Sequence, residues 1–420
     1  MISLEKTKPF KISKDEVVKA WKRVKSNKGV GGVDRESLEM FEANLSKNLY
    51  KLWNRMSSGS YFPQAVRRVE IPKRDGSLRP LGIPTVSDRV AQEVVRARLE
   101  ERLEPVFHED SYAYRPGKSA HDALDVCRHR NWKKEWVLDV DIQQFFDTIP
   151  HELLLKAVQL HCTEKWELLY IQRWLEAPVK HPSGKVESLG KGTPQGGVIS
   201  PLLANLYLHY AFDMWMVREH KTVKFVRYAD DIILHCSSKT ESEYLKRSLE
   251  RRLGECGLSL HPEKTKIVHC NVSKRREDHP EIAYKFLGYA FQPRSSRNKQ
   301  GKIFTNFLPE ASEAAQKQLR SKLKALKLRC NTHYRVQDLT ERLNPIVGGW
   351  LNYFGRYGKK AIWRMYFYVE GLLIHWVMHK YRKSKRRAVH WLRMLRRAAP
   401  RLFAHWSYFS HANGMTRRAV

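Results

Sequence analysis

Two short acidic segments carry the residue types from which a metal-dependent catalytic site could be built. The first, Tyr228-Ala229-Asp230-Asp231, has apolar residues on both sides, which predicts a β-hairpin with the acids at its tip. Two adjacent carboxylates repel each other, so such a tip normally needs a nearby cation. An ordinary Asp-Asp turn is the alternative that this segment alone leaves open.

The second segment, Asp139-Val140-Asp141, ends an apolar stretch that predicts a strand from Trp136 to Ile142. Side chains alternate along a strand, so Asp139 and Asp141 share one face. Two carboxylate-bearing strands that end side by side make an oxygen-rich site of the kind Mg²⁺ prefers. Two such ions, about 3.5–4 Å apart, can activate a 3′-hydroxyl and stabilise a pyrophosphate leaving group. The two segments together predict a site for divalent cations.

Strands and helices interleave around these segments. A hairpin is predicted over Val66–Ile83, with Asp75-Gly76 as its turn signal. A helix over Ser87–Leu103 follows, with Ser87 as its expected N-cap. Helical patterns over 151–176 and 200–217 separate the two acidic segments. Because hairpins intervene, the pattern favours an α+β fold over a doubly wound sheet.

The strand patterns stop near Pro309, and a domain boundary is predicted at residues 295–310. Residues 316–328 form a basic helical stretch. Apolar residues then recur with helical spacing from Leu343 to Phe354, and Asn344-Pro345 starts or kinks that helix.

No acidic residue follows Glu370, and the segment from there on is rich in Lys and Arg. Helical spacing puts Arg386, Arg393 and Arg397 on one face. A basic face of this kind is either solvated or binds phosphates. The one-sided charge favours nucleic-acid contact.

The composition agrees with a polyanionic partner. The 420 residues include 77 Lys and Arg against 44 Asp and Glu, a formal net charge of +33. Phosphate contacts supply most of the non-specific affinity for nucleic acids, although a merely well-solvated surface is the alternative. None of the 6 cysteines has CxxC spacing, which argues against a zinc ribbon and suits a reducing cytoplasm. No stretch is long and apolar enough to predict a membrane span.

In order and spacing, these segments resemble the fingers and palm of reverse transcriptases, and more closely those of bacterial group II intron reverse transcriptase/maturases of the type without an endonuclease. The resemblance covers about residues 27–381. The matching segments are Asn27–Asp34, Arg67–Pro84, Tyr112–Leu124, Asp139–Asp147, Gly192–Leu206, Tyr228–Asp231, Tyr284–Tyr289 (the primer grip) and Leu343–Phe354 (the thumb, or maturase X domain).

The resemblance implies a role for individual residues. The catalytic residues would be Asp141, Asp230 and Asp231, which with Ile142 would bind two Mg²⁺, for which Mn²⁺ is a possible substitute. Residues expected to contact the incoming dNTP are Lys73, Arg79, Arg115, Phe146, Gln195 and Lys264. Within that set, Phe146 would be a steric gate against a ribose 2′-hydroxyl, with a core aromatic as the alternative. Lys264 would protonate pyrophosphate, with a plain surface lysine as the alternative.

The family also implies an α+β right-hand polymerase. We expect an N-terminal extension and fingers over residues 1–125 and the palm with the catalytic site over 126–300. A helical thumb or maturase X domain over 301–382 and a basic DNA-binding-like tail over 383–420 would follow. Two departures stand out: Ala113-Tyr114 where many members have Gly-Phe, and Gly348-Gly349-Trp350 where many have Arg-Gly-Trp. An HNH-type endonuclease, present in larger members, is not expected.

The implied function is RNA-directed DNA polymerisation. The enzyme would copy an RNA template from a DNA or RNA primer with dNTPs, and it would assist group II intron splicing and retrohoming through contacts with intron RNA and target DNA. Its expected location is the bacterial cytoplasm, at the nucleoid. The first alternative is a free-standing relative in DNA repair or in phage or CRISPR defence. The second is an RNA-binding maturase with a vestigial polymerase.

Overall fold

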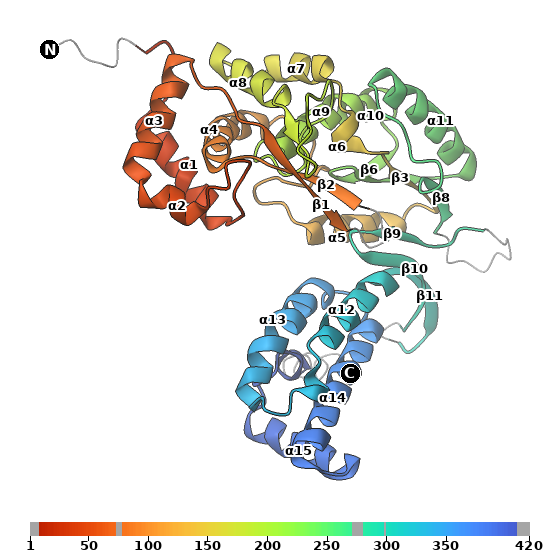
Figure 1. Ribbon diagram of the computed structural model, residues 1–420. Coiled ribbons are helices and arrows are strands. Elements are labelled where there is room, and N and C mark those ends of the chain that lie inside the picture. Colours follow the sequence, from red (N-terminus) through yellow and green to blue (C-terminus); the bar gives the residue numbers. More distant parts are fainter. Residues whose placement is uncertain (1–7, 73–77, 271–279, 298–299, 410–420) are drawn as a thin grey trace. The chain divides into compact units, whose positions relative to one another are not determined.

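The computed structural model describes residues 8–72, 78–270, 280–297 and 300–409, and its α+β class is the expected one (Figure 1). The chain divides into two compact units. The first comprises Met1–Cys127 with Val137–Ile267, and the second comprises Arg128–Trp136 with Val268–Val420. The first unit holds both acidic segments. The bounds of the four domains expected from the sequence stay predictions.

The helices of the first unit pack around two sheets. They are α1 (Lys14–Ser26), α2 (Leu38–Ala43), α3 (Leu45–Ser58), α4 (Val86–Leu103), α6 (Phe145–Thr148), α7 (His151–Gln159), α8 (Lys165–Leu175), α9 (Ser200–Leu208), the π-helix η2 (His209–Asp213), α10 (Met214–Glu219) and α11 (Lys239–Glu255), and α5 (Ala120–Asn131) continues from the first unit into the second.

Helix α4 is buried over most of its length and fixes the loop that follows β5. The predicted N-cap at Ser87 was wrong. The cap is Thr85, whose hydroxyl accepts from the Asp88 N–H at 3.1 Å and donates to the Asp88 carboxylate at 2.7 Å. One turn further on, Gln92 Oε1 accepts from the Val198 N–H at 2.7 Å. Thr85 is the cap because its hydroxyl, three residues before Asp88, can both accept from the Asp88 N–H and donate to the Asp88 carboxylate.

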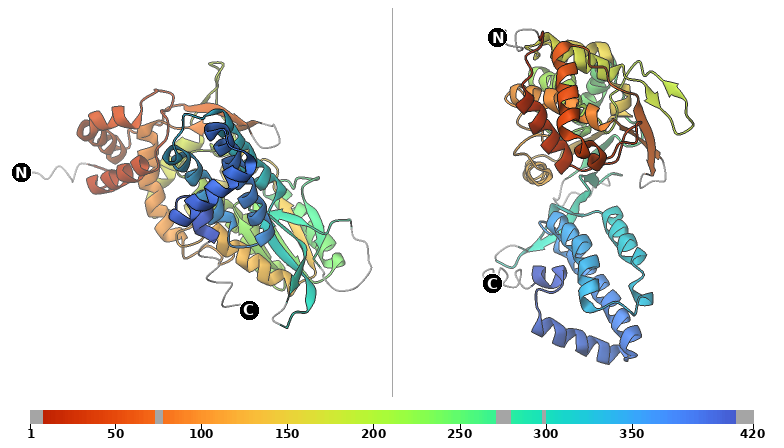
Figure 2. Two further views of the ribbon diagram at one scale, coloured as in Figure 1. Left: turned by 90° about the horizontal axis from the view of Figure 1, so that it is seen from below. Right: turned by 60° about the vertical axis from the view of Figure 1, so that its left-hand side comes forward.

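A four-stranded sheet, in the order β2-β1-β4-β5, forms one side of the first unit. Strands β1 (Val66–Pro72) and β2 (Leu78–Ile83) pair antiparallel as the predicted hairpin, with Arg67 opposite Ile83. The predicted turn at Asp75-Gly76 lies outside the described residues. Strands β4 (Val179–Lys180) and β5 (Val186–Glu187) form a second hairpin, which Figure 2 shows extending outward from this unit.

The second sheet of the first unit has the order β6-β7-β3-β8. Its strands are β3 (Trp136–Asp141), β6 (Lys224–Tyr228), β7 (Asp231–Cys236) and β8 (Lys266–His269). Val137, Leu138 and Val140 of β3 are buried, as are Ile232 to Leu234 of β7. Burial on both faces explains why these strands read as nearly continuous apolar runs. Because β3 and β7 are neighbours, two acidic segments that lie far apart in the sequence end beside each other.

The second unit combines a small sheet with a helical core. The sheet has the order β11-β10-β9, from β9 (Tyr284–Phe286), β10 (Tyr289–Arg297) and β11 (Ile303–Ala311). The helices are α12 (Glu313–Ala325), the 3-10 turn η3 (Leu328–Cys330), α13 (Val336–Phe354), α14 (Lys359–Tyr381) and α15 (Lys385–Ala398). No helix in the described parts of the chain is long and apolar enough to cross a membrane.

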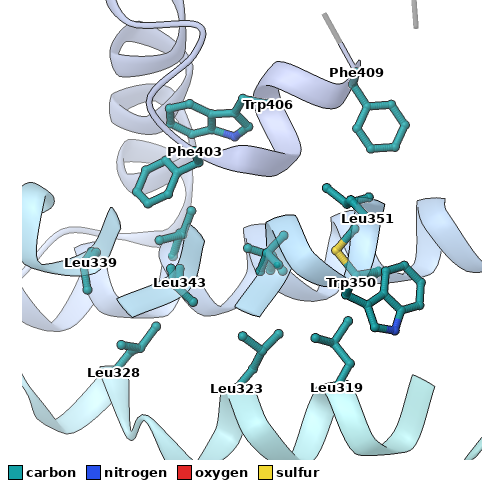
Figure 3. Close-up of a cluster of buried hydrophobic side chains, with 14 of the residues drawn as sticks. Leu319, Leu323, Leu328, Leu339, Leu343, Trp350, Leu351, Phe403, Trp406 and Phe409 are labelled. Atoms are coloured by element: carbon teal, nitrogen blue, oxygen red, sulfur yellow. The ribbon is translucent and has the colours of Figure 1, made fainter. Parts of the chain in front are cut away.

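The helical core of this unit is formed by leucines and aromatic rings from several helices. Figure 3 shows Leu319 and Leu323 of α12 below α13, and Phe403 and Trp406 above it. Pro345 lies inside α13 rather than at its start. The neighbouring Asn344 donates to the Leu402 carbonyl at 3.0 Å and accepts from the Ala404 N–H at 2.8 Å, so it anchors the C-terminal segment.

Helix α15 shares this core. Ala388 and Leu392 are buried within it, and Trp391 and Leu395 pack against it. The helix of the expected tail is therefore docked on the helical unit by its apolar face, which leaves its basic face outward.

Candidate active site

The hairpin of β6 and β7 carries two acids at its tip, as predicted. Tyr228 pairs with Asp231, which leaves Ala229 and Asp230 as the two-residue turn. Ala229 has a φ of 57°, in the left-handed region that tight hairpin turns demand. A residue with a Cβ is strained there, so surrounding contacts must hold the turn in place.

Asp141 lies at the end of the adjacent strand β3, and its negative charge affects the pKa values of the two acids at the tip of the hairpin. Burial raises the pKa of Asp230, and the Asp141 carboxylate raises it further. Burial likewise raises the pKa of Asp231 to about 7, with contributions from Asp230 and Asp141. Although Asp231 presents surface to solvent, the protein around its carboxyl group limits hydration. The three carboxylates therefore form one electrostatically coupled cluster.

Asp139 is a fourth member of this cluster. Burial raises its pKa well above the ordinary range, and Asp231 and Asp141 add to the effect.

The donor set suits hard divalent cations. Carboxylate oxygens on neighbouring strands are the ligands that Mg²⁺ and Mn²⁺ accept in nucleotidyl transfer sites, and mutual repulsion among them is relieved by a cation. Within the described ranges, no three His, Cys, Asp or Glu side chains are drawn together closely enough to hold an ion.

An open cleft of about 1120 Å³ lies beside the cluster, and most of the residues predicted to act on substrate line it. These are Arg79, Asp141, Ile142, Phe146, Gln195 and Lys264. They come from four separate segments of the sequence, and the cleft is large enough for a nucleotide. Lys73 lies outside the described residues.

Gln195 connects the β1–β2 hairpin to the acidic side of the cleft. Its side-chain carbonyl accepts from Arg79 Nε at 2.6 Å, and its amide donates to the two Asp147 oxygens at 3.1 and 3.2 Å. The Gln195 peptide carbonyl accepts from the Gly82 N–H at 2.7 Å. A Cβ at Gly196 would lie 2.5 Å from the Gly82 oxygen, so glycine is required there. The sequence reading missed Asp147, although it belongs to the matched segment.

Phe146 lies at the cleft with most of its ring buried; 8% of the residue is exposed. The ring packs against Phe145 at a centroid distance of 5.3 Å. The Phe146 carbonyl accepts from the Thr193 N–H at 2.7 Å. An anchored ring that reaches a substrate cleft fits a steric gate, and the gate stays a prediction.

Lys264 lies near the acidic cluster, but Arg115 does not reach the cleft. Lys264 Nζ is 3.8 Å from Asp141 Oδ2, and its side chain is 57% exposed. Arg115, by contrast, is almost fully buried and donates to the Glu104 carboxylate and to the carbonyls of His108 and Ser111. Its guanidinium is committed to these acceptors, so the prediction that it contacts the dNTP is corrected to a structural role.

Tyr114 is a second residue that the sequence reading missed. It is half exposed, has a φ of 56°, and lies near Asp230. Burial raises the pKa of its phenol, and the Asp230 carboxylate adds to the shift. The sequence did mark this position, because Ala113-Tyr114 stands where many family members have Gly-Phe.

The predicted nucleic-acid contacts lie on α15 of the second unit. Arg386, Arg393 and Arg397 are all exposed. The helix is capped by Ser384, whose side chain accepts from the Arg387 N–H.

Comparison with known proteins gives two family matches. The model described as "Reverse transcriptase (RNA-dependent DNA polymerase)" matches residues 71–291, more than half of the chain. The model "Group II intron, maturase-specific domain" matches residues 316–398.

Curated relatives agree with these matches. Protein YkfC of Escherichia coli is 34% identical over 278 residues, which cover 57% of this chain and 72% of that protein. The group II intron-encoded protein LtrA of Lactococcus lactis is 28% identical over 351 residues, which cover 68% of this chain and 56% of that protein. The putative COX1/OXI3 intron 1 protein of Saccharomyces cerevisiae is 26% identical over 327 residues, 66% of this chain and 38% of its own length. The chain thus spans little more than half of LtrA.

Proposed function

Because the chain belongs to the reverse transcriptase (RNA-dependent DNA polymerase) family and carries a group II intron maturase-specific domain, we propose that it copies RNA into DNA at the carboxylate cluster of β3 and β7. The observation that supports this proposal is that β3 and β7 are neighbours, so Asp141 is electrostatically coupled to Asp230 and Asp231, while Asp141 itself lines the cleft. The substrates are an RNA template, a DNA or RNA primer and dNTPs.

The carboxylate cluster is the proposed binding site for the divalent cations. Asp141, Asp230 and Asp231 would hold them, and Ile142 would contribute its main-chain carbonyl. Two Mg²⁺ ions, or Mn²⁺ in their place, would supply Lewis-acid activation of the primer 3′-hydroxyl and offset charge on the leaving pyrophosphate.

The other cleft residues bind and orient the nucleotide. Arg79 and the Gln195 amide hold the triphosphate and sugar, since a cation and a fixed amide at the cleft wall neutralise and align a phosphoryl group. Lys73 adds a second cation from the turn of the same hairpin. Phe146 blocks a ribose 2′-hydroxyl. Lys264 gives a proton to the pyrophosphate as it leaves.

The second unit supplies the maturase role. It binds group II intron RNA during splicing and target DNA during retrohoming, and the exposed arginines of α15 contact phosphates. The net charge of +33 supports these partners and a location at the nucleoid. Two readings remain open to test: a free-standing enzyme of DNA repair or defence, and an RNA-binding maturase that no longer polymerises.

Primer extension on an RNA template tests the proposal. Asp230→Asn and Asp231→Asn should each lower the extension rate by at least about 1000-fold, because the remaining carboxylates cannot fix the cations. Asp15→Asn, at an exposed position on α1, is the matched control and should extend normally. Extension by either active-site variant at a rate near that of the unmodified protein would refute the assignment.

The alternatives give different outcomes in the same system. A vestigial polymerase would bind RNA tightly and fail to extend a primer even without substitution. A free-standing enzyme would extend primers but bind group II intron RNA no better than an unrelated RNA of equal length. The proposed enzyme extends primers and prefers the intron RNA.

A further inference from the structure

A fully buried ion pair lies beneath the catalytic turn. The side chains of Arg227 on β6 and Asp213 on the π-helix η2 are both 0% exposed. Arg227 Nε donates to Asp213 Oδ1 at 2.7 Å, and Nη2 donates to Oδ2 at 2.5 Å. This two-pronged arrangement fixes the plane and position of the guanidinium.

The third nitrogen of that guanidinium reaches the turn itself. Arg227 Nη1 donates to Asn205 Oδ1 at 3.0 Å and lies 3.4 Å from the Ala229 carbonyl oxygen. Ala229 is the residue in the left-handed conformation, directly before Asp230. A donor that holds this carbonyl restrains the peptide that joins Ala229 to Asp230, and thereby the direction of the Asp230 side chain.

The backbone of Arg227 is held as firmly as its side chain. Its N–H donates to the Asp110 carbonyl at 2.9 Å, and its carbonyl accepts from the Tyr112 N–H at 2.9 Å. The backbone and the guanidinium of Arg227 are therefore both fixed by hydrogen bonds. The guanidinium in turn restrains the turn at Ala229.

The π-helix explains how Asp213 comes to face Arg227. Residues His209–Asp213 interrupt the helix between α9 and α10 with a wider turn. An extra residue per turn changes the phase of every side chain that follows, and such bulges recur at functional sites. Here it accompanies a carboxylate that lies in the interior, against β6.

Asn205 connects this network to the segment that contains Ala113 and Tyr114. Its Nδ2 donates to the Ala113 carbonyl at 2.6 Å, while its Oδ1 accepts from Arg227. Ala113 precedes Tyr114, which also has a positive φ and lies near Asp230. One buried network thus holds the two strained residues, Ala229 and Tyr114, that flank the same carboxylate.

We propose that Arg227, held by Asp213 and Asn205, is a positioning residue that sets the orientation of Asp230 and hence the affinity of the carboxylate cluster for divalent cations. This inference rests on the proposed function and goes beyond it. Stability alone explains the pair poorly, because well-packed apolar side chains of similar volume are often at least as stable as a buried ion pair.

The test replaces the pair by apolar side chains. The double variant Arg227→Met/Asp213→Leu removes both charges together, so no buried charge is left without a partner. Its melting temperature and circular dichroism should stay near those of the unmodified protein. Its affinity for Mn²⁺, measured by electron paramagnetic resonance without substrate, should fall about 10–100-fold, the usual effect of losing a group that orients a metal ligand. The Mg²⁺ concentration for half-maximal primer extension should rise in parallel.

The matched control is the partly buried pair of Arg102 and Glu167 in the same unit, in which the Arg102 side chain is 28% exposed. Arg102 Nη2 donates to Glu167 at 2.6 Å, the Glu167 side chain is 0% exposed, and neither residue lines the cleft. The variant Arg102→Met/Glu167→Leu undergoes the same chemical change and should bind Mn²⁺ normally. If the first double variant does not fold, Arg227→Lys serves instead, since it keeps the charge but loses the fork.

Each outcome decides the matter. Weak Mn²⁺ binding in the folded Arg227 variant, with normal binding in the control, supports the inference. Mn²⁺ affinity equal to that of the unmodified protein overturns it, provided that Asp230→Asn has lost its Mn²⁺. If Asp230→Asn itself keeps both Mn²⁺ affinity and primer extension, the proposed function fails instead.

Discussion

The ammonium group of Lys264 lies 3.8 Å from Oδ2 of Asp141, so the loop before β8 brings a cation to the acidic end of β3. The His261 N–H donates to the Asp141 carbonyl at 2.8 Å and holds that loop against the strand. The Lys264 side chain is more than half exposed and is free to turn toward a ligand in the cleft. This position beside Asp141 supports the prediction that Lys264 acts on the substrate, with a plain surface lysine as the alternative.

We therefore predict that Lys264→Ala lowers kcat for single-nucleotide addition by about 100-fold, because a positioned general acid contributes roughly 10²–10⁴-fold. KM for dNTP should change much less. Rapid-quench kinetics on an RNA template measures both. Lys239→Ala, at an exposed position on α11, is the control. A kcat for Lys264→Ala equal to that of the control would show that Lys264 is a plain surface lysine.

The second prediction concerns stability without metal. The Asp231 pKa of about 7 lies above its value in the unfolded chain, roughly 3.9. The folded state therefore binds the proton more tightly, so this group favours folding at low pH, and the advantage is lost as pH rises toward 7 and beyond. Asp231→Asn should raise the melting temperature in EDTA by about 1–3 °C at pH 8 and by less at pH 5.

Added Mg²⁺ should reverse this difference. A cation that binds only the folded state stabilises it by mass action, so it should raise the melting temperature of the unmodified protein more than that of Asp231→Asn. Differential scanning fluorimetry at both pH values checks the pattern. An equal response of both proteins to Mg²⁺ would argue that Asp231 is not a ligand.

The third prediction concerns sugar selection. Phe146→Ala removes a ring that is anchored against Phe145 at the cleft, so rNTPs should enter. The ratio of kcat/KM for dNTP over rNTP should fall by about 10–200-fold, the range expected when a steric contact of this size is lost. Phe146→Tyr keeps the ring and should keep most of the selectivity. If Phe146→Ala selects sugars as the unmodified protein does, the residue is a core aromatic.

The fourth prediction concerns the arginines of α15. The triple variant Arg386→Ala/Arg393→Ala/Arg397→Ala should bind template–primer more weakly at moderate salt. Its slope of log affinity against log salt should be shallower by roughly two units, since each phosphate contact contributes about 0.7–0.9. Addition of one dNTP at saturating template–primer should change little, because the cleft is untouched.

A control for this variant must remove the same charge elsewhere. Lys239→Ala/Arg247→Ala/Arg251→Ala takes three exposed cations from α11 and should leave the slope nearly unchanged. Equal slopes for the two triple variants would mean that the α15 arginines act only through net charge. The apolar face of α15, with Leu392 buried, is intact in the test variant, so loss of folding is not expected.

The sequence by itself determined the elements whose signals are local. Alternating and continuous apolar runs predicted β3, β6 and β7, and the acids at the β6–β7 tip follow from a two-residue turn between Tyr228 and Asp231. The spacing of apolar residues from Leu343 to Phe354 predicted α13, although Pro345 lies inside it. These features depend on neighbours a few residues away, which is why pattern and turn chemistry suffice for them.

Only the tertiary structure decided which polar side chains serve substrate and which serve the fold. Arg115 lies within one matched segment and Arg227 directly precedes another, yet Arg115 is bound to Glu104 and Arg227 to Asp213. The local sequence does not show whether an arginine is free to bind a phosphate or is paired with a carboxylate from another part of the sequence. Burial and pairing across many residues set that difference, because a charge inside a protein is stable only beside the partner that folding brings to it.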